Sequence, residues 1–274
     1  LFFDQEKFDL ALRDSDSCNT QLSRVCYLET LFALGRIDEI YERIEKTYKL
    51  DDKNIRLAAF SSFISEREKK DTAHNFCRNP LYFLNISNLK HHRENYIELI
   101  REVIEELDCI ETIWEPGNKT TRNGFQTPKN INLFKNSSEK IAELQAIVLD
   151  ELDTYFFKFQ EESCTYIKEW PFKKNLVAWH VILKKQGYQE AHIHPEGWLS
   201  GVIYLKVVPP LDNDEGAIEF SLNGRKFFDV NSPQLRHQPE AGDIVFFPSS
   251  LHHRTIPFST DTDRIVIAFD LIPD

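Results

Sequence analysis

The chain has 274 residues, of which 41% are hydrophobic and 28% are charged, so a disordered or low-complexity protein is excluded. Its length fits one or two domains, and no apolar run reaches the ~20 residues of a membrane-spanning helix. The formal net charge of -11 argues against nucleic acid and anionic membrane surfaces as partners, because both attract basic proteins.

The five cysteines are scattered along the chain, and no two of them form a CxxC pair. This pattern predicts neither a disulfide framework nor a zinc–thiolate site. It favours a reducing compartment, and we therefore expect a cytoplasmic protein.

Residues 1–80 are predicted to form a helical region, because apolar side chains recur there at helical spacing. Two turns, near Leu34–Glu39 and Asp51–Asn54, separate the expected helices. Their interval is close to half of a ~34-residue helical hairpin, which is typical of tetratricopeptide-like repeats. A few packed helices without repeat identity fit equally well. A repeat array would present a concave face to a protein or peptide substrate, whereas supporting helices would leave a small-molecule substrate equally plausible.

The middle of the chain is predicted to contain two further helices, at 92–107 and 138–159, again from apolar periodicity. The segment 114–130 between them is rich in Pro, Gly and Asn, and this composition predicts a loop.

Residues 81–274 are expected to form a second region that is rich in strands after Pro171. Asn223-Gly224 is a typical two-residue hairpin turn. Eight short strands fit a double-sheet jelly roll, so the predicted fold class is α+β, with helices first and a jelly roll after them. The predicted strands are 176–183, 189–194, 199–207, 216–221, 225–230, 243–247, 252–257 and 264–271.

Six of the nine histidines lie in the strand-rich part, and three of them have a spacing that suits a metal site. In an extended segment the side chains of His192 and His194 project from one face. A third imidazole, from His252 or His253, follows a predicted strand, and neutral imidazole is the commonest protein ligand of transition metals. Glu196 is the leading substitute for one histidine. An isolated histidine, in contrast, is more often a packing residue.

Arg264 stands at the beginning of an apolar strand, where a cation has little structural purpose unless it holds an anion. Arginine binds carboxylates with two parallel hydrogen bonds. The spacing alone fits a surface arginine that pairs with Asp261 or Asp263 nearly as well.

Together these motifs resemble the 2-oxoglutarate- and Fe(II)-dependent oxygenases with a double-stranded β-helix core, and in particular a bacterial branch with tetratricopeptide-type helices before the oxygenase. The resemblance extends from about Asn79 to the C-terminus. The segments that carry it are Trp179–Leu183, His192–Tyr204, Pro239–Ser249, His253, Pro257 and Arg264, with Thr120–Thr127 and Asn132–Phe134 as a lead-in.

The resemblance implies a role for each candidate residue. His253 matches the distal iron ligand, and Arg264 matches the arginine that binds the distal carboxylate of 2-oxoglutarate. Tyr204 matches a tyrosine whose hydroxyl assists that arginine, and Ser200 is expected to face the same pocket. The implied reaction is hydroxylation of a substrate, coupled to conversion of 2-oxoglutarate into succinate and CO2.

This chain departs from the usual first motif of the family, H-x-D or H-x-E, because it has His192-Ile193-His194. The ligand set is then three histidines, or two histidines completed by water or Glu196. Two other functions compete with the oxygenase. A cupin-type metalloenzyme would leave Arg264 and Tyr204 without a task, and an inactive helical scaffold would need none of these residues.

Overall fold

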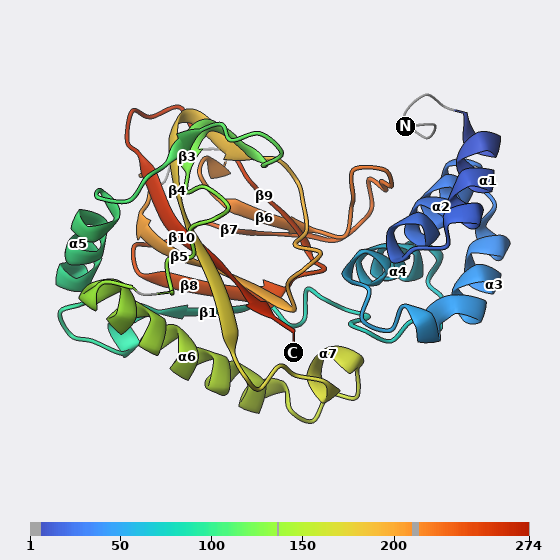
Figure 1. Ribbon diagram of the computed structural model, residues 1–274, viewed down its shortest axis with the longest axis horizontal. Coiled ribbons are helices and arrows are strands. Elements are labelled where there is room, and N and C mark those ends of the chain that lie inside the picture. Colours follow the sequence, from blue (N-terminus) through green and yellow to red (C-terminus); the bar gives the residue numbers. More distant parts are fainter. Residues whose placement is uncertain (1–6, 136, 210–213, 274) are drawn as a thin grey trace.

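The computed structural model describes residues 7–135, 137–209 and 214–273. Figure 1 shows the helices α1 to α4 grouped beside a β-rich part whose outer side carries α5 and α6. The chain is thus α+β, as predicted, with helices before strands. Residues 1–6 of the predicted helical region lie outside the described residues. No helix in the described ranges is both long and apolar enough to cross a membrane.

The helices at the beginning of the chain are confirmed, and so are the two turns between them. They are α1 (Phe8–Cys18), α2 (Gln21–Ala33), α3 (Ile37–Thr47) and α4 (Ile55–Glu68), with a short 3-10 turn η2 (Tyr48–Leu50). The Thr20 hydroxyl accepts a hydrogen bond from the Ser23 amide and thereby caps α2. Ile40 and Ile44 of α3 are fully buried, because an amphipathic helix packs through its apolar stripe.

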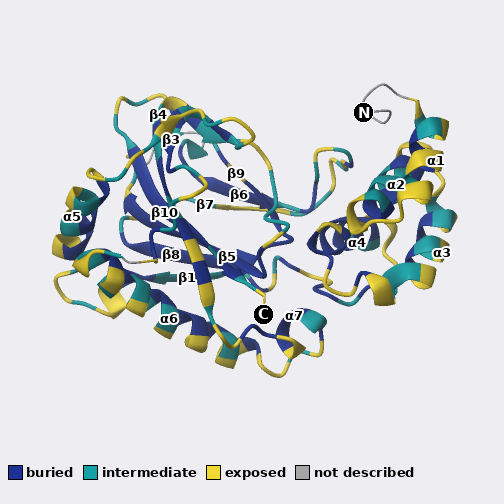
Figure 2. Cartoon of the chain, in the orientation of Figure 1, coloured by how far each residue is buried: buried dark blue, intermediate teal, exposed yellow. Residues whose placement is uncertain are grey.

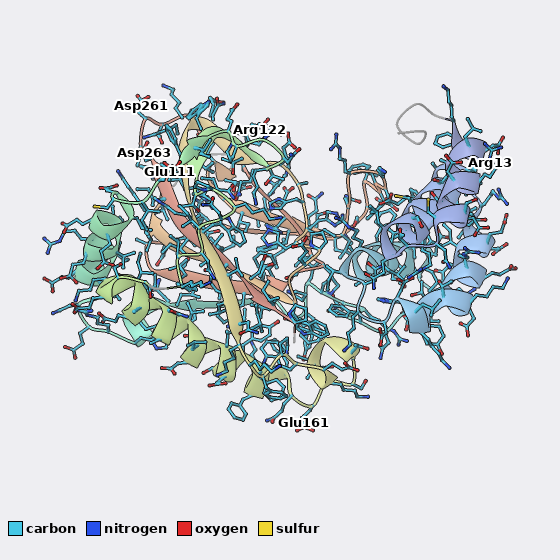
Figure 3. The ribbon with its side chains drawn as sticks, viewed as in Figure 1. Arg13, Glu111, Arg122, Glu161, Asp261 and Asp263 are labelled. Atoms are coloured by element: carbon cyan, nitrogen blue, oxygen red, sulfur yellow. The ribbon has the colours of Figure 1, made fainter. Side chains whose placement is uncertain are left out.

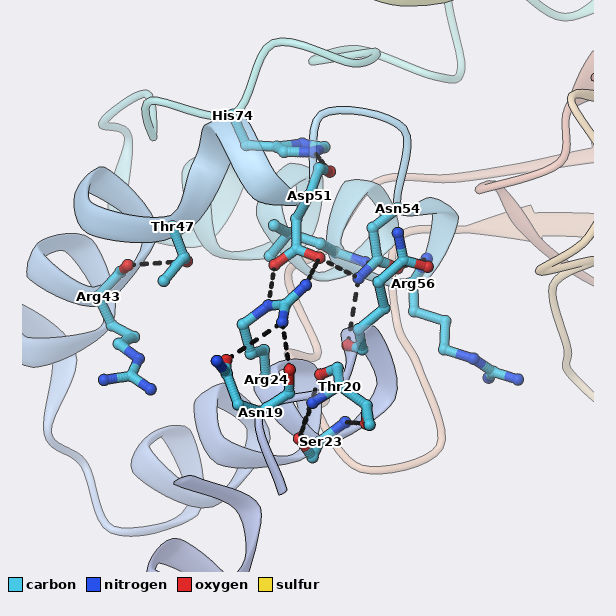
Figure 4. Close-up of polar contacts among 12 residues, drawn as sticks. Asn19, Thr20, Ser23, Arg24, Arg43, Thr47, Asp51, Asn54, Arg56 and His74 are labelled. Carbon is cyan, nitrogen blue, oxygen red and sulfur yellow. Dashed lines mark hydrogen bonds and ion pairs between the residues drawn. The ribbon is translucent and has the colours of Figure 1, made fainter. Parts of the chain in front are cut away.

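A buried ion pair ties α2 to the turn that precedes α4 (Figure 4). The Arg24 guanidinium donates to both carboxylate oxygens of Asp51, at 2.6 and 2.7 Å. The Asn54 amide also donates to Asp51, while its side-chain oxygen caps α4. This hydrogen bonding to Asp51 raises the pKa of Arg24. The buried cation of the helical unit is therefore fully paired, as a buried charge requires.

The strands form two antiparallel sheets that face each other. The seven-stranded sheet has the order β1 (Asn85–Asn88), β8 (Asp243–Pro248), β5 (Leu199–Lys206), β10 (Arg264–Ile272), β4 (Asn175–Gln189), β3 (Thr121–Gln126) and β2 (Ile113–Trp114). The three-stranded sheet has the order β7 (Gln234–His237), β6 (Ile218–Ser221) and β9 (His252–Thr255).

The central strands of the large sheet are covered on both faces. β5, β8 and β10 are nearly continuous apolar runs, and this pattern is typical of strands buried on both sides. α5 (Tyr96–Leu107), α6 (Glu139–Phe159) and the short α7 (Thr165–Lys168) pack on the outer face, preceded by the 3-10 turn η3 (Leu89–His91). In Figure 2 these strands are dark blue, whereas the helices are yellow toward solvent.

A long connection between β6 and β7, residues 222–233, links the small sheet to the helical unit (Figure 1). We call this segment the arm. Phe227 on the arm contacts Phe60 and Phe63 of α4, with ring centroids 5.2 and 4.8 Å apart. The apolar core of the helices is therefore continuous with the interior of the barrel.

The arm replaces a hairpin that the sequence predicts wrongly. Asn223-Gly224 does not join two paired strands, and 225–230 contains no strand, since β6 pairs with β7 and β9. The Asn223 side chain instead hydrogen-bonds the amide and carbonyl of Asp229, which closes a longer loop. Burial of Phe227 against α4 then stabilises this loop in place of a tight turn.

Two further predictions of strands and loops need correction. The expected strand at 189–194 is absent, because β4 continues to Gln189 by pairing with β3. The expected loop at 114–130 contains β2 and β3. β1, which pairs with β8, and β7 were not predicted either. These short polar strands owe their conformation to their neighbours rather than to their own residues.

Candidate metal centre and cosubstrate pocket

Three histidines from two distant segments meet at the open end of the barrel. His192 and His194 follow β4, and His253 lies on β9. The backbones of His192 and His253 exchange two hydrogen bonds, at 3.0 and 3.1 Å, which join the two segments. Among the described residues, these three side chains form the group able to hold a metal ion, and their ligand atoms lie within 4.8 Å of one another.

Each of the three imidazoles is oriented by a contact at its Nδ1 atom. His192 and His253 donate to backbone carbonyls, of Glu190 at 2.6 Å and of Leu251 at 3.1 Å. His194 Nδ1 lies 2.6 Å from a carboxylate oxygen of Asp270. Carbonyl and carboxylate oxygens only accept, so each Nδ1 carries a proton, and in a neutral ring Nε2 then keeps its lone pair.

The Nε2 atoms of the histidines converge. Lone pairs that face one another repel unless a cation lies between them. The Nε2 atoms of His192 and His194 are 3.1 Å apart. Two imidazole nitrogens bound at right angles to a metal, each at ~2.1 Å, are separated by ~3 Å. The spacing of these two ligand atoms therefore fits a transition-metal ion.

His192 and His253 are also in the protonation state that a metal needs. Burial lowers the pKa of His192 to about 3 and that of His253 well below its usual value of 6.5, and the neighbouring imidazoles lower both further. Neutral imidazole is the form that binds metals, so these two ligands are ready at neutral pH.

A buried arginine lies deeper in the same cavity. Arg264, at the beginning of β10, is 2% exposed, and its guanidinium lies 4.9 Å from the centre of the Tyr204 ring on β5. Its Nε atom donates a hydrogen bond to the Gly216 carbonyl at a long 3.3 Å. Within the described ranges, its Nη1 atom and the Tyr204 hydroxyl have no hydrogen-bond partner.

Among the residues that the structure describes, no carboxylate pairs with this buried cation. Burial lowers the pKa of Arg264 and raises that of Tyr204 to about 12. Arginine nevertheless stays charged, and an unpaired buried charge is strongly destabilising. A carboxylate placed between the guanidinium and the metal would satisfy both free donors. The chemistry of the cavity therefore fits a dicarboxylate such as 2-oxoglutarate.

One cavity contains both parts of the site and opens into a larger cleft. Its lining comprises Trp179, Gln189, His192, His194, Gly201, Val202, Tyr204, Ile218, Phe247, His253, Thr255, Arg264 and Ala268. The outer cleft, of about 570 Å³, shares Trp179, His192 and His194 with this cavity and adds the loops around Lys119 and Lys129. Trp179 packs against the His194 ring at 5.4 Å. A substrate in the outer cleft would thus lie beside the metal.

The other candidate residues lie nearby. Glu196 is exposed and lines the outer cleft, outside the metal-binding group. His252 is on the opposite face of β9, where it packs against Phe227. The Ser200 hydroxyl contacts His194 Nδ1 at 2.9 Å and Asp270 at 2.7 Å, so it lies behind a candidate metal ligand rather than along the cavity wall.

The alternative of a surface arginine is wrong for Arg264. Asp263 pairs with Lys184 at 2.7 Å, and Asp261 pairs with Lys185 at 3.3 Å. Figure 3 shows both aspartates at the periphery of the molecule. The aromatic side chains of Trp179 and Phe247 line the cavity. Trp198 and Phe246 belong to the core on the helical side of the sheet.

Comparison with known proteins agrees with this site. Residues 177–270 match a protein family described as "Putative 2OG-Fe(II) oxygenase". The matched segment begins in β4 and ends in β10, and it contains all three histidines and Arg264. This segment, about a third of the chain, is thus similar to the 2-oxoglutarate- and Fe(II)-dependent oxygenases. No curated protein matches the chain in sequence.

Solved structures that are similar to this chain include the following three. A prolyl hydroxylase from Trichoplax adhaerens, in complex with a peptide of hypoxia-inducible factor, has a TM-score of 0.51 and 12% identity, covering 83% of this chain and 93% of that one. A prolyl-4-hydroxylase from Pseudomonas putida has a TM-score of 0.48 and 15% identity, covering 70% and 92%. HygX from Streptomyces hygroscopicus, with nickel, 2-oxoglutarate and hygromycin B bound, has a TM-score of 0.45 and 13% identity, covering 72% and 88%. The first of these likenesses shows that this chain shares the fold of that hydroxylase.

Sequence reasoning missed Asp270, which lies behind His194. A signal was present, because Asp270 is an acidic residue within the apolar strand Arg264–Ile272. Such a residue is costly unless it has a buried partner. Its partner, however, is 76 residues away in sequence.

Proposed function

We propose that the chain is an Fe(II)- and 2-oxoglutarate-dependent dioxygenase that hydroxylates a substrate in the outer cleft and releases succinate and CO2. One observation carries this proposal. A single cavity contains three imidazoles with converging lone pairs and a buried guanidinium that has no carboxylate partner among the described residues. His192, His194 and His253 would hold the metal. Glu196 remains the substitute ligand.

Each residue has a definite task in this reaction. When bound, Fe(II) supplies the activation of dioxygen that drives both decarboxylation and hydroxylation. Arg264 holds the distal carboxylate of 2-oxoglutarate, and Tyr204 donates its free hydroxyl to the same group. Ser200 keeps the His194 ring in place. Trp179 and Phe247 form apolar walls and exclude water from the cavity.

Two kinds of substrate are proposed, a protein or peptide and a small molecule. α4 begins 34 residues after α2, at Ile55 against Gln21, and this spacing supports tetratricopeptide-like hairpins that bind a protein or peptide. The outer cleft of about 570 Å³, however, has the size of a small-molecule site. The five cysteines, all free, support a cytoplasmic enzyme. The boundary between the helical and oxygenase regions, near residue 80, is part of this proposal.

An anaerobic titration tests the proposal directly. Metal-free protein is loaded with Fe(II), 2-oxoglutarate is added, and the weak visible charge-transfer band of the chelate is recorded. Admission of oxygen should then produce succinate. Iron binding without the band would favour a cupin-type metalloenzyme, and a failure to retain iron would favour an inactive scaffold.

A further inference from the structure

Asp270 is a partly buried acid beside the candidate metal centre, and the proposed reaction gives it no task. It lies on β10 between Phe269 and Leu271, and its side chain is 14% exposed. Its Oδ1 atom accepts from His194 Nδ1 at 2.6 Å and from the Ser200 hydroxyl at 2.7 Å.

The chain is closely packed around this carboxylate. A Cβ atom at Gly197 would lie 3.1 Å from Cγ of Asp270 and 2.6 Å from the Ser249 hydroxyl oxygen. Ser249 in turn contacts the Ser200 hydroxyl at 2.8 Å. A glycine and two hydroxyls thus allow the acid to approach His194, which indicates a positioned contact rather than a chance surface pair.

Asp270 does not itself belong to the metal-binding group. Its carboxylate contacts Nδ1 of His194, whereas Nε2 of the same ring points toward His192. The imidazole therefore lies between the acid and the place of the ion. Three neutral imidazoles leave the charge of a divalent ion uncompensated, and charges in a buried site interact strongly.

We infer that Asp270 is a positioning residue that fixes the Nδ1-protonated form of His194 and transmits its negative charge to the metal through that ring. A carboxylate hydrogen-bonded to a ligating histidine makes the histidine a more basic ligand, and loss of such a partner typically weakens metal binding by ~10–100-fold. This inference rests on the proposed function, because it assumes that His194 is a metal ligand.

The test compares Co(II) binding by the full chain with that by Asp270→Asn, followed by visible absorption. The variant keeps the size of the side chain and removes its charge. The expected result is a ~10–100-fold larger Kd for Co(II). The matched control is Asp243→Asn, because Asp243 is a buried acid that contacts His237 at 2.9 Å away from the metal site. Its Co(II) affinity should equal that of the unaltered chain.

Proton NMR of the Co(II)-loaded chain separates positioning from a structural role. The unaltered chain should show three solvent-exchangeable, paramagnetically shifted imidazole N–H signals. In Asp270→Asn, the His194 signal alone should shift or disappear. A structural role would move all three signals or none.

The possible failures are distinguishable. An unaltered chain that binds no Co(II) would contradict the proposed function itself. Equal Co(II) affinity of the unaltered chain and Asp270→Asn would overturn the role of Asp270 alone. If the variant does not fold, the unaltered chain still decides, because absence of the signal assigned to the His194 Nδ1 proton would overturn the role of Asp270.

Discussion

Replacement of Arg264 by methionine should change cosubstrate affinity and protein stability in opposite directions. Methionine is unbranched and fills the channel of the arginine stem, so the substitution mainly removes the charged head. That head is 2% exposed and has a free Nη1 atom. Hydrogen bonds to charged groups contribute ~1.5–3 kcal/mol each, so loss of a two-bond contact with a carboxylate costs ~3–6 kcal/mol. The Kd for 2-oxoglutarate should therefore rise at least ~100-fold.

The metal-free variant should be more stable than the native chain. Replacement of a buried charged group by an apolar one of similar volume is often stabilising by ~1–4 kcal/mol. Arg264 gains little from its long hydrogen bond to the Gly216 carbonyl, so we expect a gain in this range. For a protein of this size the thermal midpoint should rise by a few degrees.

The assay is scanning calorimetry of the metal-free proteins, with 2-oxoglutarate binding followed separately by the charge-transfer band of the Fe(II) form. Arg254→Met on β9 is the control, because its guanidinium is 47% exposed at the side chain and pairs with Glu219. That control removes one of the two arginines that pair with the buried Glu219, and it should leave the affinity for 2-oxoglutarate unchanged. A metal-free Arg264→Met chain that is less stable than native, and that binds 2-oxoglutarate normally, would show that Arg264 is a structural cation.

Three further predictions concern other parts of the chain. His253→Ala should abolish Co(II) binding, whereas His252→Ala should leave it intact, because His252 packs on the outer face of β9. Equilibrium dialysis measures Co(II) binding by both variants, and the reverse result would exchange the two assignments. Burial lowers the pKa of His180 to about 4, so its contribution is complete above pH 6.5 and declines as the pH falls toward 4. Between pH 7 and pH 5, the unfolding free energy of His180→Leu should therefore fall by ~2 kcal/mol less than that of the native chain. Urea titrations measure this difference, and an unchanged pH dependence would contradict it. Phe227→Ala should reduce stability by ~3–5 kcal/mol and expose the helical unit to limited proteolysis while Co(II) affinity is retained, and an unaltered cleavage pattern would show that the arm does not hold the helices.

The parts of the site that the sequence could predict depend on local spacing. His192 and His194 are two residues apart, and this spacing alone places them on one side of an extended segment. Arg264 is recognisable as a cation at the beginning of an apolar strand. The choice between His252 and His253 needed the resemblance, because both lie on the same short strand. In the structure the alternation of β9 separates them, with His253 toward the other histidines and His252 toward Phe227.

The features that could not be predicted depend on contacts between distant segments. The asparagine and glycine of β3 are typical of a loop, and Asn123 indeed has a positive φ. β3 nevertheless pairs with β4 across a bulge. The arm reads as a hairpin because Asn-Gly favours a tight turn, but the burial of Phe227 against α4 outweighs that preference. The contact between Asp270 and His194 likewise arises from folding of the whole sheet. Local propensity carries no information on any of these three contacts.

The two buried arginines of this chain show why the unsatisfied groups mark a ligand site. Arg24 is held by both oxygens of Asp51, and the pair fastens two helices together. Arg264 is more completely buried, yet it has a free Nη1 atom beside the free hydroxyl of Tyr204. The fold can thus provide an acid for a buried arginine where only stability is concerned. No described acid pairs with Arg264, and the same cavity contains three convergent imidazole lone pairs. The charges that would complete this cavity are those of a dicarboxylate and a divalent ion.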